Sequence, residues 1–108
     1  MWKETLSDLI KGVGNFAKAN PPVANAVRQL NATARENSVL DVKTHELIAL
    51  AVAVTTRCDG CISAHVHAAK KAGASKEEVA AALGTAIALN TGAAYVYSGR
   101  VVDAYDEL

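Results

Sequence analysis

The chain has 108 residues, of which 51% are hydrophobic and only 5% aromatic, and its 11 basic and 11 acidic residues cancel to a formal net charge of zero. A chain of this length supports one domain, whose core must be built mainly from Ala, Val, Leu and Ile side chains. Without a basic excess or a run of like charges, the sequence predicts neither a nucleic-acid partner nor binding to an anionic membrane. We therefore expect a single compact domain spanning residues 1–108.

The first half of the chain predicts three helices. Apolar residues recur at the spacing of one helix face in two successive stripes, and Pro21 and Pro22 end the first helix and open the second. A third helix is expected over residues 43–55, where apolar side chains point in nearly every direction, so it should be buried inside the fold or inside an assembly. The two stripes consist of Trp2, Leu6, Leu9, Ile10, Val13 and Phe16, and of Val23, Ala26, Val27, Leu30 and Ala34.

The second half predicts three more helices. The fourth begins at Asp59 and ends near Gly73, a residue type that commonly follows a helix C-terminus. Residues 75–78 form a capping box that opens the fifth helix, and after residues 90–92 a sixth apolar stripe continues to the C-terminus. No strand, repeat or linker is needed, so the sequence predicts an all-α fold of about six helices.

The N-terminus and the hydropathy pattern predict a cytoplasmic protein. Charged and polar residues stand where a secretory signal needs an apolar run, and no segment is expected to be long enough to span a membrane. In a reducing compartment, two nearby cysteines are more often catalytic or metal-binding than a permanent cross-link.

Both cysteines lie in one octet, residues 58–65, together with a histidine. Cys58 and Cys61 have the Cys-x-x-Cys spacing at which two thiols close a small, reversible disulfide. At about 100° per residue, Cys58, Cys61 and His65 share one face of the fourth helix, with Cys61 in its first turn. A helix N-terminus and a neighbouring imidazole both favour the thiolate, so the octet predicts a redox-active thiol.

Glu46 is a further candidate site residue, because it lies on the third helix, which is otherwise largely apolar. A carboxylate buried there needs a partner or must stay protonated. A proton relay to His65 and a structural salt bridge are the two alternatives for it. His67 lies about 200° around the helix from His65 and is expected at the solvent or at an interface, and His45 is given no role.

Three features of the chain lie in the order Glu46, then the run of Cys58, Cys61 and His65, then residues 73–75. With these features the sequence resembles the alkylhydroperoxidase D / carboxymuconolactone decarboxylase family over about residues 40–103. The resemblance implies an all-α fold assembled as trimers or hexamers. It also implies a thiol pair that reduces hydroperoxides and is reduced again by a dithiol donor, lipoyl or thioredoxin-like. By this resemblance Cys61 meets the peroxide, Cys58 resolves it, and Glu46 and His65 form the proton relay.

Gly60 departs from the pattern of alkylhydroperoxidase D, which has another histidine just before the second cysteine. One member of the relay is therefore absent. This argues against strong peroxidase activity and against a peroxiredoxin partner, but not against membership, since members of the family differ at this position.

The favoured interpretation is a thiol-dependent hydroperoxide reductase in which Cys61 attacks and Cys58 resolves. Thioredoxin-like sites would favour Cys58 as the attacking thiol, but His65 follows Cys61 by one turn and can accept its proton directly. The alternatives are a disulfide reductase without peroxidase activity, a decarboxylase-like enzyme, whose chemistry does not need the cysteine pair, and an assembly module without catalysis. A zinc site formed by both cysteines and His65 is a further alternative, although these are three ligands and a structural zinc site requires four. Neither a metal nor a cofactor is expected.

A chain of this size cannot cover all its apolar stripes by itself. The third helix is apolar on nearly every side, and the fifth and sixth helices are rich in Ala and Gly. The sequence therefore predicts a symmetric homo-oligomer. The resemblance implies a trimer-based assembly, with a hexamer favoured.

Overall fold

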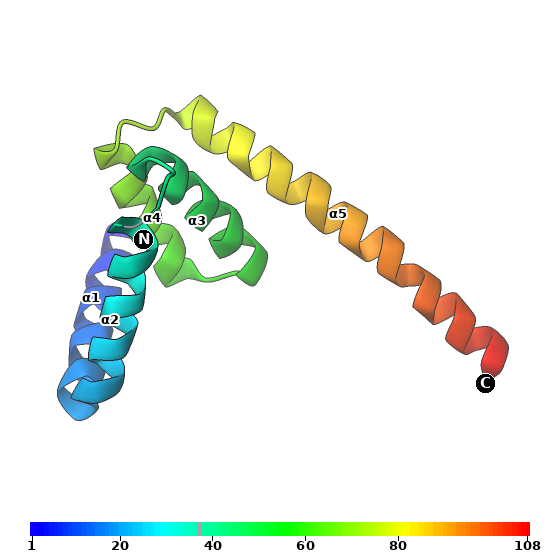
Figure 1. Cartoon of the computed structure of the whole chain (residues 1–108), viewed down its shortest axis with the longest axis horizontal. Helices are drawn as coiled ribbons and strands as arrows, with labels where there is room; N and C mark the ends of the chain where they lie inside the picture. Colours follow the sequence, from blue (N-terminus) through cyan, green and yellow to red (C-terminus); the bar gives the residue numbers. More distant parts are fainter. Residues whose placement is uncertain (37) are drawn as a thin grey trace.

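The computed structural model describes residues 1–36 and 38–108, which form five α-helices and no strand (Figure 1). The expected all-α fold is confirmed, but five helices replace the predicted six. The helices are α1 (Trp2–Ala19), α2 (Pro21–Glu36), α3 (Val42–Thr56), α4 (Asp59–Lys71) and α5 (Lys76–Glu107).

The predicted fifth and sixth helices are one continuous helix of 32 residues, α5. Residues 90–92 were expected to separate them because Asn, Thr and Gly are poor helix formers. Their combined penalty is only about 2 kcal/mol, which the hydrogen bonds of the flanking turns offset, and no proline follows to break the helix. Asn90 also donates a hydrogen bond of 2.9 Å from Nδ2 to Thr55 Oγ1, which ties the middle of α5 to the end of α3.

The predicted helix ends are confirmed. Ser75 Oγ accepts the Glu78 N–H, and Glu78 Oε1 accepts the Ser75 N–H, both at 3.0 Å, so the capping box opens α5. Gly73 follows the end of α4 with a φ of 84°, a backbone conformation that glycine adopts without strain. α2 begins at Pro21, directly after the turn that ends α1.

α3 lies between α4 and α5, while α1 packs on α4 and α2 packs on α1 (Figure 1). The buried apolar side chains are few and small and come from the three central helices. The expected burial of α3 is met on one side only within this chain, since Ile48 is 49% exposed and Val52 56%. The buried apolar residues are Leu50, Ala53, Ala69 and Ala86.

α3 and α5 run parallel, but α5 is much longer. Lys43 Nζ lies 2.7 Å from Glu78 Oε2 where both helices begin, and Thr55 bonds Asn90 where α3 ends. The contact with Glu78 raises the pKa of Lys43, and the contact with Lys43 lowers the pKa of Glu78. Beyond Asn90, residues 91–108, here termed the α5 extension, are exposed throughout and project roughly 25 Å past α3 at 1.5 Å per residue (Figure 1).

α5 also corrects the expectation that no segment is long enough to span a membrane. Within the described residues it is the one helix whose length and apolar composition would permit a crossing. Core helices of soluble proteins meet the same criteria, so this is weak support for a membrane role. The part of α5 up to Asn90 packs along α3.

Candidate functional site

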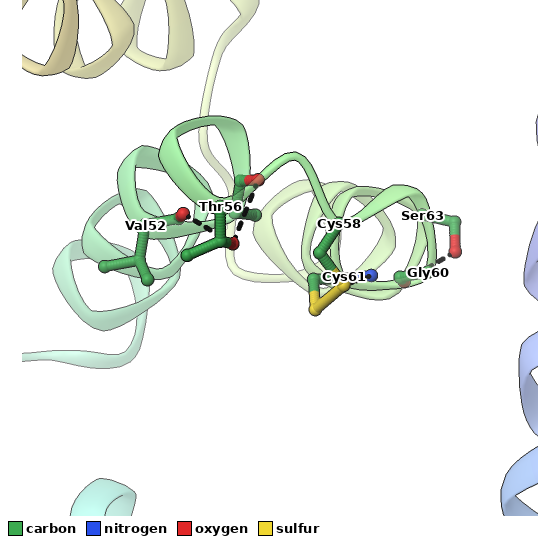
Figure 2. The surroundings of a disulfide bond; sticks show 7 residues. Val52, Thr56, Cys58, Gly60, Cys61 and Ser63 are labelled. Atoms are coloured by element: carbon green, nitrogen blue, oxygen red, sulfur yellow. Dashed lines mark hydrogen bonds between the residues drawn. A yellow bond between two sulfur atoms is a disulfide. The ribbon is translucent and has the colours of Figure 1, made fainter.

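Cys58 and Cys61 form a disulfide at the N-terminus of α4, with their Cα atoms 5.2 Å apart (Figure 2). Arg57 ends α3 in the left-handed conformation, at φ 55° and ψ 50°, and so turns the chain into α4 within one residue. Cys58 is then the N-cap of α4, and its Sγ accepts the backbone N–H of Cys61 at 3.1 Å. The sulfur of Cys58 therefore lies at the positive end of the α4 dipole and accepts a backbone N–H there.

Cys61 and His65 line the same pocket, which has a volume of about 240 Å³. α3 supplies the rest of the wall, and Figure 2 shows two of its residues, Val52 and Thr56, beside the disulfide. Of the two sulfurs, that of Cys61 belongs to a residue of the pocket wall, whereas Cys58 lies at the helix cap. The remaining residues of the wall are Ala49 and Ala53.

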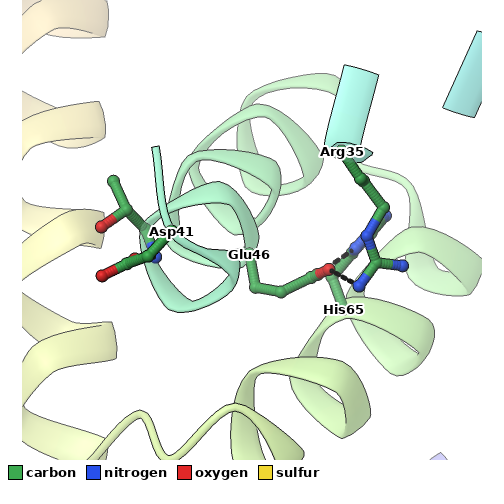
Figure 3. Close-up of polar contacts among 5 residues, drawn as sticks. Arg35, Asp41, Glu46 and His65 are labelled. Carbon is green, nitrogen blue, oxygen red and sulfur yellow. Dashed lines mark hydrogen bonds and ion pairs between the residues drawn. The ribbon is translucent and has the colours of Figure 1, made fainter. Parts of the chain in front are cut away.

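Glu46 is fully buried, at 0% exposure, and its two oxygens face different partners (Figure 3). His65 Nδ1 lies 2.6 Å from Oε2, and Arg35 Nη2 lies 3.2 Å from Oε1. An ionised carboxylate only accepts, so in that form of Glu46 the shared proton belongs to Nδ1, and a neutral imidazole then has its free lone pair on Nε2. The contacts that the two alternatives for Glu46 require are therefore both present, the histidine on one oxygen and the arginine on the other.

Arg35 is the residue of this site that sequence reasoning missed. It lies at the polar end of the second helix, where an arginine side chain is normally exposed to solvent. The only signal was general: a carboxylate buried at Glu46 requires a cation, and no spacing rule says which of the 11 basic residues supplies it.

Gly60 faces Leu9 of α1, so a side chain at this position would press on the α1–α4 contact. A Cβ built at this position would lie 3.0 Å from Leu9 Cδ1. Real Cβ atoms rarely approach a neighbour so closely, so Leu9 would have to move for any larger side chain. A histidine at this position would therefore meet the Leu9 side chain of α1 at its first side-chain atom.

Gly60→His is expected to lower the free energy of unfolding by about 1–3 kcal/mol, because the imidazole would overpack the contact with Leu9. Urea unfolding measures the change. Gly12→Ala on α1 is the control: it has open space, and alanine is expected to stabilise that helix by up to about 1 kcal/mol. A Gly60→His variant as stable as the parent and faster with peroxide would show that the position faces the pocket instead.

Within residues 1–36 and 38–108, no three His, Cys, Asp or Glu side chains are grouped as metal ligands would be. His67 is exposed, in agreement with the prediction. The zinc alternative needs Cys58, Cys61 and His65 as free ligands, and metal analysis of protein purified without chelator tests it.

The fold and the site define an all-helical protein with a Cys-x-x-Cys disulfide at a helix start and a buried glutamate paired to a histidine one turn further on. Residues 21–104 match the carboxymuconolactone decarboxylase family, and the chain belongs to that family. The resemblance noted in the sequence is thereby confirmed.

Similar proteins extend over nearly the whole chain. An uncharacterised protein of Haemophilus influenzae is 61% identical over 104 residues, 96% of this chain and 92% of the relative. Uncharacterised protein 4 in the cox locus of Paracoccus denitrificans is 32% identical over 96 residues, 89% of this chain and 86% of the relative.

Two crystal structures have a similar fold. One is a carboxymuconolactone decarboxylase family protein of Legionella pneumophila in its apo form, with a TM-score of 0.78 and 31% identity over 98% of this chain and 95% of that one. The other, from Methanobacterium thermoautotrophicum, has a TM-score of 0.74 and 28% identity over 80% of this chain and 97% of that one. None of these four names states a reaction, so the reaction must be argued from the site.

Proposed function

We propose that the protein is a thiol-dependent hydroperoxide reductase that uses Cys61 as the attacking thiol and Cys58 as the resolving thiol. The observation that carries the proposal is that Cys61 and His65 line one pocket while Glu46 holds the Nδ1 of His65 at 2.6 Å. A thiol beside an oriented imidazole is the arrangement that produces a nucleophilic thiolate at neutral pH.

The first step begins from the reduced protein. His65 accepts the proton of Cys61 at Nε2, and the thiolate attacks one oxygen of the hydroperoxide. An S–O bond forms as the O–O bond breaks, and the departing alkoxide takes the proton back from His65 and leaves as the alcohol. Cys61 is oxidised to a sulfenic acid, and the peroxide is reduced.

The second step closes the disulfide that the structure contains. Cys58 attacks the sulfur of the sulfenic acid, an S–S bond forms, the S–O bond breaks, and the hydroxyl leaves as water after taking up one proton. The N–H of Cys61, which points at Cys58 Sγ, stabilises Cys58 as a thiolate. This favours Cys58 both as the resolving thiol and as the leaving group when the disulfide is reduced.

The return to the reduced state requires a dithiol donor, for which we propose a lipoyl or thioredoxin-like partner in the cytoplasm. One of its thiols attacks Cys61, which releases Cys58, and its second thiol then displaces Cys61. Over the whole cycle one hydroperoxide and one dithiol give one alcohol, one water and one disulfide, so the electrons balance.

A disulfide reductase without peroxidase activity is the second candidate function. The observation that favours it is Gly60, because the relay of alkylhydroperoxidase D has an additional histidine there, and here a Cβ would lie 3.0 Å from Leu9 of α1. The same thiol pair would then exchange with disulfides of small molecules or proteins.

One equivalent of cumene hydroperoxide distinguishes the two functions when it is mixed with the reduced protein. The peroxidase function predicts the loss of two thiols and the formation of one equivalent of alcohol. The disulfide reductase would leave the hydroperoxide intact and react only with an added disulfide. A decarboxylase-like enzyme would keep its activity after both cysteines are replaced by serine.

A second copy of this chain is the further partner that we propose, in a trimer-based homo-oligomer with a hexamer favoured. The α5 extension exposes seven large apolar side chains, and exposed apolar surface of this kind commonly marks an interface. An open groove of about 300 Å³ between α3 and α5, which includes Ile48, Val52 and Leu89, offers a surface for the extension of a neighbour. The exposed apolar residues of the extension are Tyr95, Val96, Tyr97, Val101, Val102, Tyr105 and Leu108.

Sedimentation at micromolar concentration is expected to show an assembly larger than a monomer. Replacing both Tyr97 and Val101 by Glu should reduce its size, because charges would enter an apolar contact, whereas Lys3→Glu at an exposed site should not. A stable monomer of the unmodified chain at that concentration would overturn the assembly.

A further inference from the structure

We infer that Arg35 is a positioning residue of the site: its guanidinium keeps the Glu46 carboxylate charged and directed at His65, so that His65 presents an unprotonated Nε2 toward Cys61. The inference rests on the proposed role of His65 as the base. It assigns a function to an arginine that reaches the site from α2, outside the octet and outside α3.

The charge balance around Glu46 points to Arg35. The carboxylate is fully buried, and removing such a group from water costs several kcal/mol unless a cation or hydrogen bonds compensate it. Oε2 bonds His65, but Oε1 makes no hydrogen bond within the described residues and has the Arg35 guanidinium at 3.2 Å as its charge partner.

No other cation described in the structure is placed to do the same. Lys43 lies on α3 as Glu46 does, but its ammonium is 2.7 Å from Glu78 of α5, at the start of both helices. From α4 the group facing Glu46 is His65 itself, and a protonated His65 could not act as a base. Arg35 is thus the cation that the structure places against the buried Glu46 carboxylate.

Removal of the guanidinium leaves Glu46 Oε1 buried without the charge partner that the structure shows for it. A buried carboxylate without such a partner favours its protonated form. A protonated Glu46 donates to Nδ1 of His65, and the neutral imidazole then carries its proton on Nε2. Nε2 then has no lone pair with which to accept the proton of Cys61.

The test uses the alkylation of Cys61 by iodoacetamide in a Cys58→Ser background, because alkylation reports thiolate formation without any peroxide. Arg35→Gln is expected to slow alkylation near neutral pH by about tenfold. The difference should shrink in alkaline solution, where the thiol ionises without help. Arg35→Lys keeps the charge and should retain most of the neutral rate.

Arg28→Gln is the matched control, because Arg28 lies on the same helix and hydrogen-bonds Asn25 rather than the site. Its alkylation profile should equal that of the parent. If Arg35→Gln unfolds more easily but keeps the parent's profile, or if Arg35→Lys is as slow as Arg35→Gln, Arg35 is not a positioning residue. A parent protein that fails to reduce hydroperoxides would overturn the proposed function, but it would leave this measurement intact.

Discussion

Cys61→Ser is expected to abolish hydroperoxide reduction, whereas Cys58→Ser is expected to react once and stop at a sulfenic acid on Cys61. The first variant loses the sulfur that shares the pocket with His65. The second keeps this sulfur and the histidine but loses the thiol that would close the disulfide. Dimedone labelling followed by mass spectrometry identifies the sulfenic acid and the residue that carries it.

The opposite pattern would reverse the roles of the two cysteines. If Cys58→Ser did not react and Cys61→Ser formed a stable sulfenic acid, the sulfur that caps the helix would be the attacking one, as in thioredoxin-like sites. Both replacements are nearly isosteric, so far-ultraviolet circular dichroism of the two variants is expected to match that of the reduced parent and to exclude unfolding as the cause.

His65→Gln is expected to slow the reaction of Cys61 with hydroperoxide by at least about 100-fold near neutral pH, because general bases typically contribute this much. Glu46→Gln should act in the same direction with a smaller effect, since the amide cannot stabilise the imidazolium that forms during the reaction. Both effects should decline in alkaline solution. Stopped-flow rates in the Cys58→Ser background between neutral and alkaline pH measure them.

His67→Gln is the control for this series, because His67 is an exposed histidine of the same helix. The dependence of the reaction rate on pH distinguishes a role in proton transfer from a structural role. A Glu46→Gln variant that loses stability but follows the parent's profile would show that the ion pair with Arg35 is the whole role of Glu46.

The local features of the fold could be predicted from the sequence because each depends on neighbouring residues. The capping box at Ser75, the helix start at Pro21 and the stop near Gly73 are set by turn and cap chemistry within a few positions. The continuity of α5 could not be predicted in the same way. Residues 90–92 are locally unfavourable for a helix, and the contact of Asn90 with Thr55, which ties them to α3, joins residues that are far apart in the sequence.

In the candidate site, too, the local features could be predicted from the sequence and the long-range contacts could not. The grouping of Cys58, Cys61 and His65 was predicted from helical periodicity. In the structure a disulfide joins Cys58 to Cys61, and Cys61 and His65 line one pocket. The partners of Glu46 depend on how α2 and α4 lie against α3. The pairing with His65 was one of two hypotheses, and Arg35 was not foreseen because its helix reaches the site only through the packing of α1 and α2.

The single chain leaves the α5 extension and one side of α3 exposed. Burial within one chain therefore understates how protected α3 would be in an assembly. The proposed assembly would account for the apolar length of α5 without a membrane, and the sedimentation experiment tests it.

Stopped-flow mixing of the fully reduced protein with organic hydroperoxides is the most direct measurement of the proposed reaction. The arrangement of Cys61 beside His65 and Glu46 predicts oxidation at a rate well above that of free cysteine at the same pH, with the Cys58–Cys61 disulfide as the product. A rate no higher than that of free cysteine would contradict the peroxidase function and leave thiol–disulfide exchange as the chemistry of the pair.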